Sequence, residues 1–108
     1  MELAFDSKEL RSICESEEDA KQQLNSFVVE SLKHRLADLR AAISIKDLVA
    51  GKIRPLDNSD QQMVADLSDG YQLIFCANHP KNPLLESGNL DWSRVSRIKI
   101  LGIKNNYE

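Results

Sequence analysis

Hydrophobic and polar positions between residues 63 and 77 form two strand-like runs on either side of Asp69-Gly70. An Asp-Gly pair between two such runs is typical of a β-hairpin with a type I′ turn, because both central residues of that turn need a positive φ. Both faces of the two runs are largely apolar. We therefore expect this hairpin to lie centrally in a sheet that is covered on at least one side.

A two-residue turn at this place also predicts which residues face each other across the hairpin. Asp66 would face Leu73, and Val64 would face Phe75. Tyr71, Leu73 and Phe75 have the bulkiest side chains, which indicates that their face is the core face. Asp66 would lie on the same face, where a polar residue is unexpected. The opposite face would form the floor of a site.

The first forty residues predict one strand and two helices. Residues 1–5 alternate weakly, and Asp6 with Glu9 forms a plausible capping box at the start of the first helix. Ser16 is followed by three acidic residues, which favours a break and a second helix start. From about residue 17 to 42, apolar side chains recur at three- and four-residue steps, the signature of an amphipathic helix that packs on a core. These residues are Leu24, Phe27, Val28, Leu32, Leu36 and Leu39.

Short segments, separated by turn-forming residues, follow this helix. Ser44 is a candidate cap for a single turn at residues 47–50, and Gly51 is a candidate left-handed residue that closes it. Pro55 favours an extended backbone for residues 52–56. We expect a loop at 57–60 before the hairpin begins.

The C-terminal third predicts a long loop and a last strand. Residues 78–91 are rich in Pro, Gly and Asn, and residues 92–103 hold the strand, with Arg97 and Lys99 on one face and isoleucines on the other. The whole order, strand, two helices and then three or four antiparallel strands, predicts one α+β domain over residues 1–108. Its helices would lie on one side of an antiparallel sheet.

Charge is unevenly distributed along the 108 residues, whose net charge is −3. Residues 1–30 hold 8 acidic and 3 basic side chains (net −5), and residues 31–108 hold 9 acidic and 11 basic ones (net +2). This balance argues against nucleic-acid binding by the whole surface and leaves room for a local basic strip. No apolar run reaches the roughly 18 residues of a membrane helix, and no basic segment of a signal peptide opens the chain.

Cysteine and histidine offer no metal site. Cys14 and Cys76 lie far apart in the sequence, which is typical of a reduced, cytoplasmic protein, and Cys76 reads as a small, buried apolar group. Neither His34 nor His79 has a partner at ligand spacing. We therefore expect neither a metal nor a cofactor.

Several motifs, read together, resemble a HigB-type toxin of the RelE/ParE superfamily. Segments 5–11, 35–42 and 92–101 are the most similar to that family. The Arg-Pro-Leu piece after a glycine-closed turn, the Gly-Tyr-x-Leu-x-Phe strand that starts at Gly70 and the Asn-Tyr near the C-terminus add to the resemblance, which spans nearly the whole chain.

This resemblance implies the toxin half of a toxin–antitoxin pair. HigB- and RelE-like members cleave mRNA on the ribosome, and a helix-turn-helix antitoxin normally neutralises a HigB-type toxin. The partners it implies are therefore the ribosome, mRNA and such an antitoxin, with DNA reached only through the antitoxin. ParE-like members share the fold and poison DNA gyrase without cleaving RNA.

Four positions depart from the family pattern. Asp57 stands where a Lys is usual, and Gln72 stands where the family often has Arg. The ending Asn106-Tyr107-Glu108 replaces the more common Asp-Tyr-His. These departures concern the cleavage chemistry rather than the fold.

Metal-free RNA cleavage needs a base, an acid and a cation that stabilises the charged phosphorane. The candidate catalytic residues are Arg54 as the cation, Tyr107 as a stacking ring or hydroxyl, and Glu108 as a base. An ordinary solvated surface is the competing interpretation of the basic residues on the last strand. The candidate RNA-binding residues are Lys52, Arg94, Arg97, Lys99 and Lys104.

Three functions follow from these residues and the resemblance. The first is a ribosome-dependent mRNA endonuclease that inhibits translation. The second is a non-enzymatic ParE-like toxin that binds gyrase, which the missing Lys and Arg favour. The third is an inactive module that retains only its contact with the antitoxin.

Overall fold

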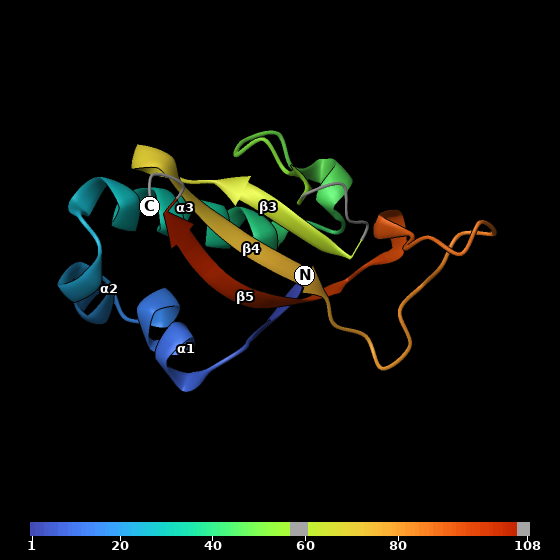
Figure 1. Cartoon of the computed structure of the whole chain (residues 1–108), viewed down its shortest axis with the longest axis horizontal. Helices are drawn as coiled ribbons and strands as arrows, with labels where there is room; N and C mark the ends of the chain where they lie inside the picture. The colour runs from blue at the N-terminus through green and yellow to red at the C-terminus, as the bar shows by residue number, and fades with distance from the viewer. Residues whose placement is uncertain (57–60, 106–108) are drawn as a thin grey trace.

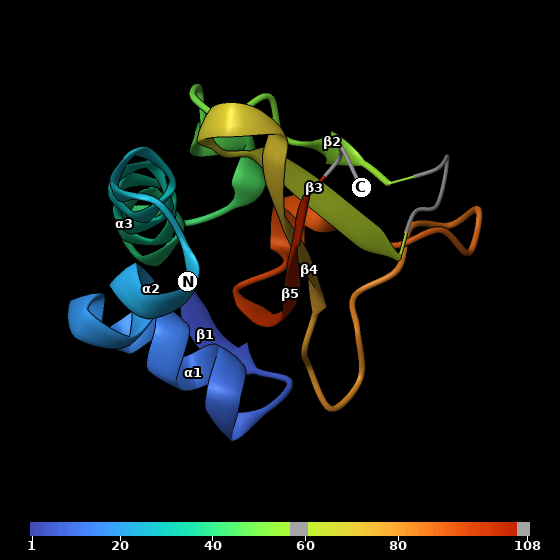
Figure 2. The same ribbon diagram turned by 60° about the vertical axis from the view of Figure 1, so that its left-hand side comes forward.

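Three helices cover one face of a five-stranded sheet in the computed structural model, which describes residues 1–56 and 61–105 (Figure 1). The helices lie together on one side of the sheet (Figure 2), and short 3-10 turns join the later elements. The helices are α1 (Lys8–Glu15), α2 (Glu17–Gln23) and α3 (Ser26–Ala41). The strands are β1 (Glu2–Phe5), β2 (Arg54–Pro55), β3 (Gln62–Asp66), β4 (Tyr71–Ala77) and β5 (Arg97–Asn105). Among the described residues, no helix is long and apolar enough to cross a lipid bilayer.

The sheet is mixed, with strand order β1-β5-β4-β3-β2. Strands β2, β3, β4 and β5 pair antiparallel, whereas β1 runs parallel to β5. The α+β class is confirmed, but the expectation of a purely antiparallel sheet is wrong. The reason is topological: β1 and β5 are separated by almost the whole chain, so no tight turn sets their relative direction.

Local capping divides the N-terminal half into three helices rather than two. The Ser16 side chain accepts a hydrogen bond from the Asp19 backbone at 3.3 Å, so the expected second helix start is confirmed. The Asn25 side chain accepts from the Val28 backbone at 3.0 Å and starts α3, which breaks the single helix expected over residues 17–42. The first helix is capped by Ser7 and not by Asp6, because the Ser7 hydroxyl accepts from the Leu10 backbone at 3.1 Å.

The core lies between α3 and the inner face of the sheet. Most of the predicted helical stripe is buried there, but Phe27 is 72% exposed, so its predicted place in the stripe is wrong. Phe75 on β4 is fully buried and meets the Trp92 ring edge-on, with ring centroids 6.1 Å apart. The other large, fully buried side chains are Val28, Val29, Leu32, Leu36, Leu39, Val64, Leu73, Val95, Ile98 and Ile100.

The central hairpin forms at the predicted place with a register shifted by one residue. Asp69 and Gly70 both have positive φ, 57° and 76°, as a type I′ turn requires. However, Asp66 faces Gln72 rather than Leu73, and the Leu67 N–H bonds to the Tyr71 carbonyl.

Contact with α3 explains this shift. The N–H of Ser68 donates to the Ser31 hydroxyl at 3.0 Å instead of pairing across the hairpin, so β3 carries one extra residue before the turn. Because side chains alternate along a strand, a one-residue shift exchanges the two faces of β3. Met63 and Ala65 therefore join the core, and Val64 and Asp66 point to the opposite face. The predicted place of Val64 and Asp66 on the core face is wrong.

The segment that leads into β2 packs closely against β3 and α3 at Gly51. The expected 47–50 turn is instead a 3-10 turn at Ile45–Asp47, and Ser44 caps it in a capping box with Asp47. Gly51 has a φ of +89°, as predicted, and its carbonyl accepts from the Asp66 N–H at 2.6 Å. A Cβ atom at Gly51 would lie 2.9 Å from Cδ of Arg35 on α3.

Replacing Gly51 with alanine should lower the free energy of unfolding by about 2 kcal/mol or more, because it adds a steric clash to an unfavourable backbone conformation. Gly88 is the matched control. Its φ is +93°, and a Cβ atom there would meet nothing within 4 Å. Gly88→Ala should therefore cost only about 1 kcal/mol. Urea unfolding of both variants tests this, and equal losses would contradict a specific contact between Gly51 and Arg35.

Candidate nucleic-acid interface

The face of the sheet that points away from the helices, called the outer face here, carries the predicted basic residues of β2 and β5. Three rows of paired residues cross it, one at its centre and one toward each end, as the strand registers show. The central row is Arg54, Val64, Ile74 and Gly102. The second row is Asp66, Gln72 and Lys104. A third row, Gln62, Cys76, Lys99 and Ala4, completes the outer face as far as β1.

Two lysines on β5 point outward on this face, on either side of Gly102 in the sequence. Ile98 and Ile100 are buried in the core, so Lys99 points outward, as the predicted alternation required. A bulge between Ile74 and Phe75 of β4 shifts the pairing, and Lys104 also points outward, opposite Gln72. Within the part of the chain that the structure describes, neither lysine forms an ion pair.

Gly102 lies between these lysines and leaves space above the sheet. Its φ lies outside the left-handed region, and a Cβ atom at this position would meet nothing within 4 Å. The backbone there does not require glycine. Ile74, which is half-buried, pairs with Gly102 on this face, whereas Val64 in the same row is only 2% exposed and offers almost no surface to a ligand.

Arg54 lies on the same face and is held by an acidic partner. Its Nη2 donates to Oδ1 of Asp66 at 3.1 Å, and its Nη1 donates to the Lys52 carbonyl at 2.7 Å. The same Asp66 oxygen is within 3.4 Å of Nε2 of Gln72, whose side chain is 93% buried. The guanidinium is thus held by two hydrogen bonds and remains exposed to solvent.

The edge of the outer face next to β1 is electrostatically mixed. Nε of Arg97 lies 3.0 Å from Oε2 of Glu2, which faces it on β1. Burial raises the pKa of the Cys76 thiol, while the positive charge of Lys99 lowers it and the carboxylate of Asp6 raises it. Cys76, which is half-buried rather than fully buried, therefore stays neutral at neutral pH and adds no charge to the face.

The remaining predicted site residues are distributed elsewhere. Arg94 belongs to a 3-10 turn before β5, where its guanidinium donates to Asp91 and to the Leu84 carbonyl, each at 2.7 Å. Lys52, two residues before Arg54 of β2, is exposed and has a φ of 47°. Tyr107 and Glu108, like the altered positions Asp57 and Asn106, lie outside the described residues.

The described outer face has cations and hydrogen-bond donors but lacks an obvious acid–base pair. Its cations can bind phosphate oxygens, and the half-buried Ile74 can pack against a sugar or a base. Over residues 1–56 and 61–105, no group of three His, Cys, Asp or Glu side chains could hold a metal ion. What the described residues of this face offer is a set of cations that can bind an anion.

Two residues of this face were missed by the sequence reasoning. Gly102 interrupts a strand, and an isolated glycine in a strand often marks a place where another molecule or chain approaches closely. The sequence alone therefore indicated a special role for Gly102. The ion pair between Asp66 and Arg54 could not be predicted from the sequence, because it depends on the one-residue shift of the hairpin.

Comparison with protein-family models, with curated proteins and with solved structures finds no match to this chain.

Proposed function

We propose that this chain is a HigB-type toxin with a RelE/ParE-like fold and that its outer face binds RNA. The observation that carries the proposal is the arrangement of Lys99, Gly102 and Lys104 on one strand face. Two lysines without ion pairs among the described residues flank the open space above Gly102, beside the half-buried Ile74. The resemblance in segments 5–11, 35–42 and 92–101 supports the same function.

The proposed activity is cleavage of mRNA on the ribosome. Lys99 and Lys104 would hold the phosphate backbone, and the Arg54 guanidinium would stabilise the charge that develops on the attacked phosphate. Tyr107 and Glu108 would supply the stacking ring and the base. The proposed partners are the ribosome, mRNA and a helix-turn-helix antitoxin that neutralises the toxin.

The ion pair between Arg54 and Asp66 favours a second candidate, a toxin of the same fold that acts by binding alone. A guanidinium that already has a carboxylate partner at 3.1 Å is a weaker stabiliser of a phosphorane than a free one. In that case the target is a protein such as gyrase.

Controlled expression of the chain in bacterial cells, with growth recorded and mRNA 5′ ends mapped, tests the proposal. We expect growth arrest and new cleavage sites inside translated frames. Three changes should each relieve the arrest while the protein stays folded by circular dichroism: Arg54→Ala, Arg97→Ala combined with Lys99→Ala, and Tyr107→Ala. Lys21→Ala on α2 is the control and should remain toxic.

The possible outcomes separate the two candidates. Growth arrest with intact mRNA would replace the endonuclease by a binding toxin, and DNA damage would then point to gyrase. Full toxicity of all three variants would mean that the site lies elsewhere. If the chain causes no arrest, it is an inactive module that retains only its contact with the antitoxin.

A further inference from the structure

The carboxylate of Asp66 lies between two cations at one end of the outer face. In the row Asp66, Gln72 and Lys104, it stands on β3, two strands away from Lys104 on β5, which is about 10 Å at the usual spacing of strands. On the side of β2, its Oδ1 lies 3.1 Å from Nη2 of Arg54. An anion that approaches Arg54 therefore meets a negative charge that already binds the guanidinium.

Of the two partners in this ion pair, Asp66 is the more firmly held. Its backbone N–H donates to the Gly51 carbonyl at 2.6 Å, and its Oδ1 lies 3.4 Å from Nε2 of the buried Gln72. Arg54 belongs to the two-residue strand β2 at the edge of the sheet, and its side chain is 44% exposed. The guanidinium can therefore turn toward a ligand more easily than the carboxylate can move away.

The contacts of Arg54 also limit how it can bind a phosphate. A guanidinium binds phosphate most strongly when two parallel N–H groups donate together. Here Nη2 donates to Asp66 and Nη1 donates to the Lys52 carbonyl, so both terminal nitrogens already have an acceptor. Exposed ion pairs of this kind are weak, so a phosphate group can take the place of the carboxylate.

We propose that Asp66 is an internal competitor for the anion site of Arg54, so that a phosphate group binds this guanidinium only by displacing the carboxylate. As regulation of the outer face, this inference rests on the proposed function. Its consequence is a preference for strands over single phosphate groups. A strand that Lys104 also holds presents its next phosphate to Arg54 at a high effective concentration, whereas a free phosphate has no such advantage over Asp66.

Titration of the full chain with inorganic pyrophosphate, followed by the backbone NMR signals of residues 52–54 and 64–66, tests this competition. Asp66→Asn keeps the shape of the side chain and removes its charge. We expect this variant to bind pyrophosphate about threefold more tightly than the wild type, or better. In the background of Arg54→Ala, the same change should raise the affinity much less, because no guanidinium is left to be freed.

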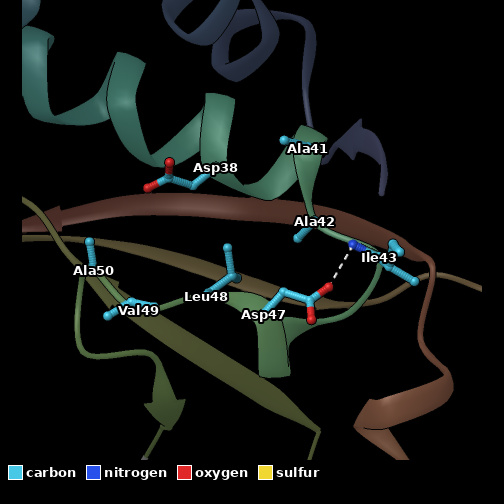
Figure 3. A pocket seen from close by; sticks show the side chains of 8 residues that line it. All are labelled: Asp38, Ala41, Ala42, Ile43, Asp47, Leu48, Val49 and Ala50. Carbon is cyan, nitrogen blue, oxygen red and sulfur yellow. Dashed lines mark hydrogen bonds between the residues drawn. The ribbon is translucent and has the colours of Figure 1, made fainter.

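Asp38→Asn is the matched control, since it removes the same charge from another half-exposed aspartate that is paired with an arginine. Oδ2 of Asp38 lies 3.6 Å from Nε of Arg35. Asp38 borders a groove of about 430 Å³ between the end of α3 and the segment that follows it, away from the outer face (Figure 3). This control should bind pyrophosphate as the wild type does.

The proposal is overturned if Asp66→Asn fails to tighten pyrophosphate binding, if Asp38→Asn gives the same gain, or if the gain persists in full without Arg54. Absence of pyrophosphate binding in every variant also overturns it. Weaker binding by Asp66→Asn would show that the carboxylate positions the guanidinium for its ligand instead of competing with it.

RNA binding by the same variants separates this inference from the proposed function. If Asp66→Asn tightens pyrophosphate binding and no variant binds RNA, the competition is confirmed and RNA is not the ligand. If the wild type binds RNA and Asp66→Asn leaves pyrophosphate binding unchanged, only the competition by Asp66 is wrong.

Discussion

Reversing the charge of both lysines on β5, with Lys99→Glu and Lys104→Glu, should abolish growth arrest and weaken RNA binding by about a hundredfold or more. The two side chains flank the space above Gly102, and each would neutralise a phosphate. Removing two phosphate contacts should also lower the slope of log affinity against log salt concentration by about 2. Fluorescence anisotropy of a labelled single-stranded RNA at several salt concentrations measures both quantities.

Lys8→Glu combined with Lys21→Glu makes the same change in net charge on α1 and α2. This control should keep the salt slope and the toxicity of the wild type. An equal loss of affinity in the control would show that RNA responds only to net charge, and the outer face would then have no specific role.

Gly102→Leu separates shape from charge at the same place. The added side chain enters open space, and the backbone there is not left-handed, so the free energy of unfolding should hardly change. RNA binding and toxicity should nevertheless fall, because the leucine occupies the open space between Lys99 and Lys104. Undiminished RNA binding by this variant would mean that RNA does not enter the space between the two lysines.

Replacing Phe75 with alanine should lower the free energy of unfolding by about 3–5 kcal/mol. Phe75 is fully buried, lies on the central strand β4 and packs edge-on against Trp92. A domain of this size is stabilised by only about 5–15 kcal/mol, so the variant should be partly or wholly unfolded at 37 °C. Trp92 is the single tryptophan of the chain, so its fluorescence reports this unfolding directly.

Phe27→Ala provides the control for this prediction. The Phe27 side chain is 72% exposed on α3, so its loss should change stability by less than about 0.5 kcal/mol. Equal stability of the two variants in urea unfolding would contradict the central place of Phe75 in the core.

Local signals in the sequence predicted many elements correctly. Ser16 as a helix start, and the positive φ of Gly51, Asp69 and Gly70, depend only on neighbouring atoms of the chain. The alternation that points Lys99 outward is equally local, because β-strand geometry alone dictates it. Asn25 is a typical helix-capping residue, but the hydrophobic periodicity over residues 17–42 favoured a single long helix, so the helix start at Asn25 was missed.

The candidate site was predictable in part for the same reason. Arg54 and Lys99 were recognised from residue type and from the motifs around them, and the structure places both on the outer face with Lys104. Arg94 was a candidate on charge alone, and only its hydrogen bonds to Asp91 and to the Leu84 carbonyl reveal its role within the loop.

By itself, the sequence determined the α+β class, the place of the hairpin turn and the basic face of the last strand, since each follows from interactions within a few residues. Only the tertiary structure decided the register of β3, the parallel pairing of β1 with β5 and the partner of Arg54. The Ser31 hydroxyl, 37 residues from Ser68, takes the N–H that would otherwise close the hairpin and so exchanges the faces of β3. A contact between groups so far apart in the chain leaves no trace in local patterns, because it exists only once the helix and the sheet have packed together.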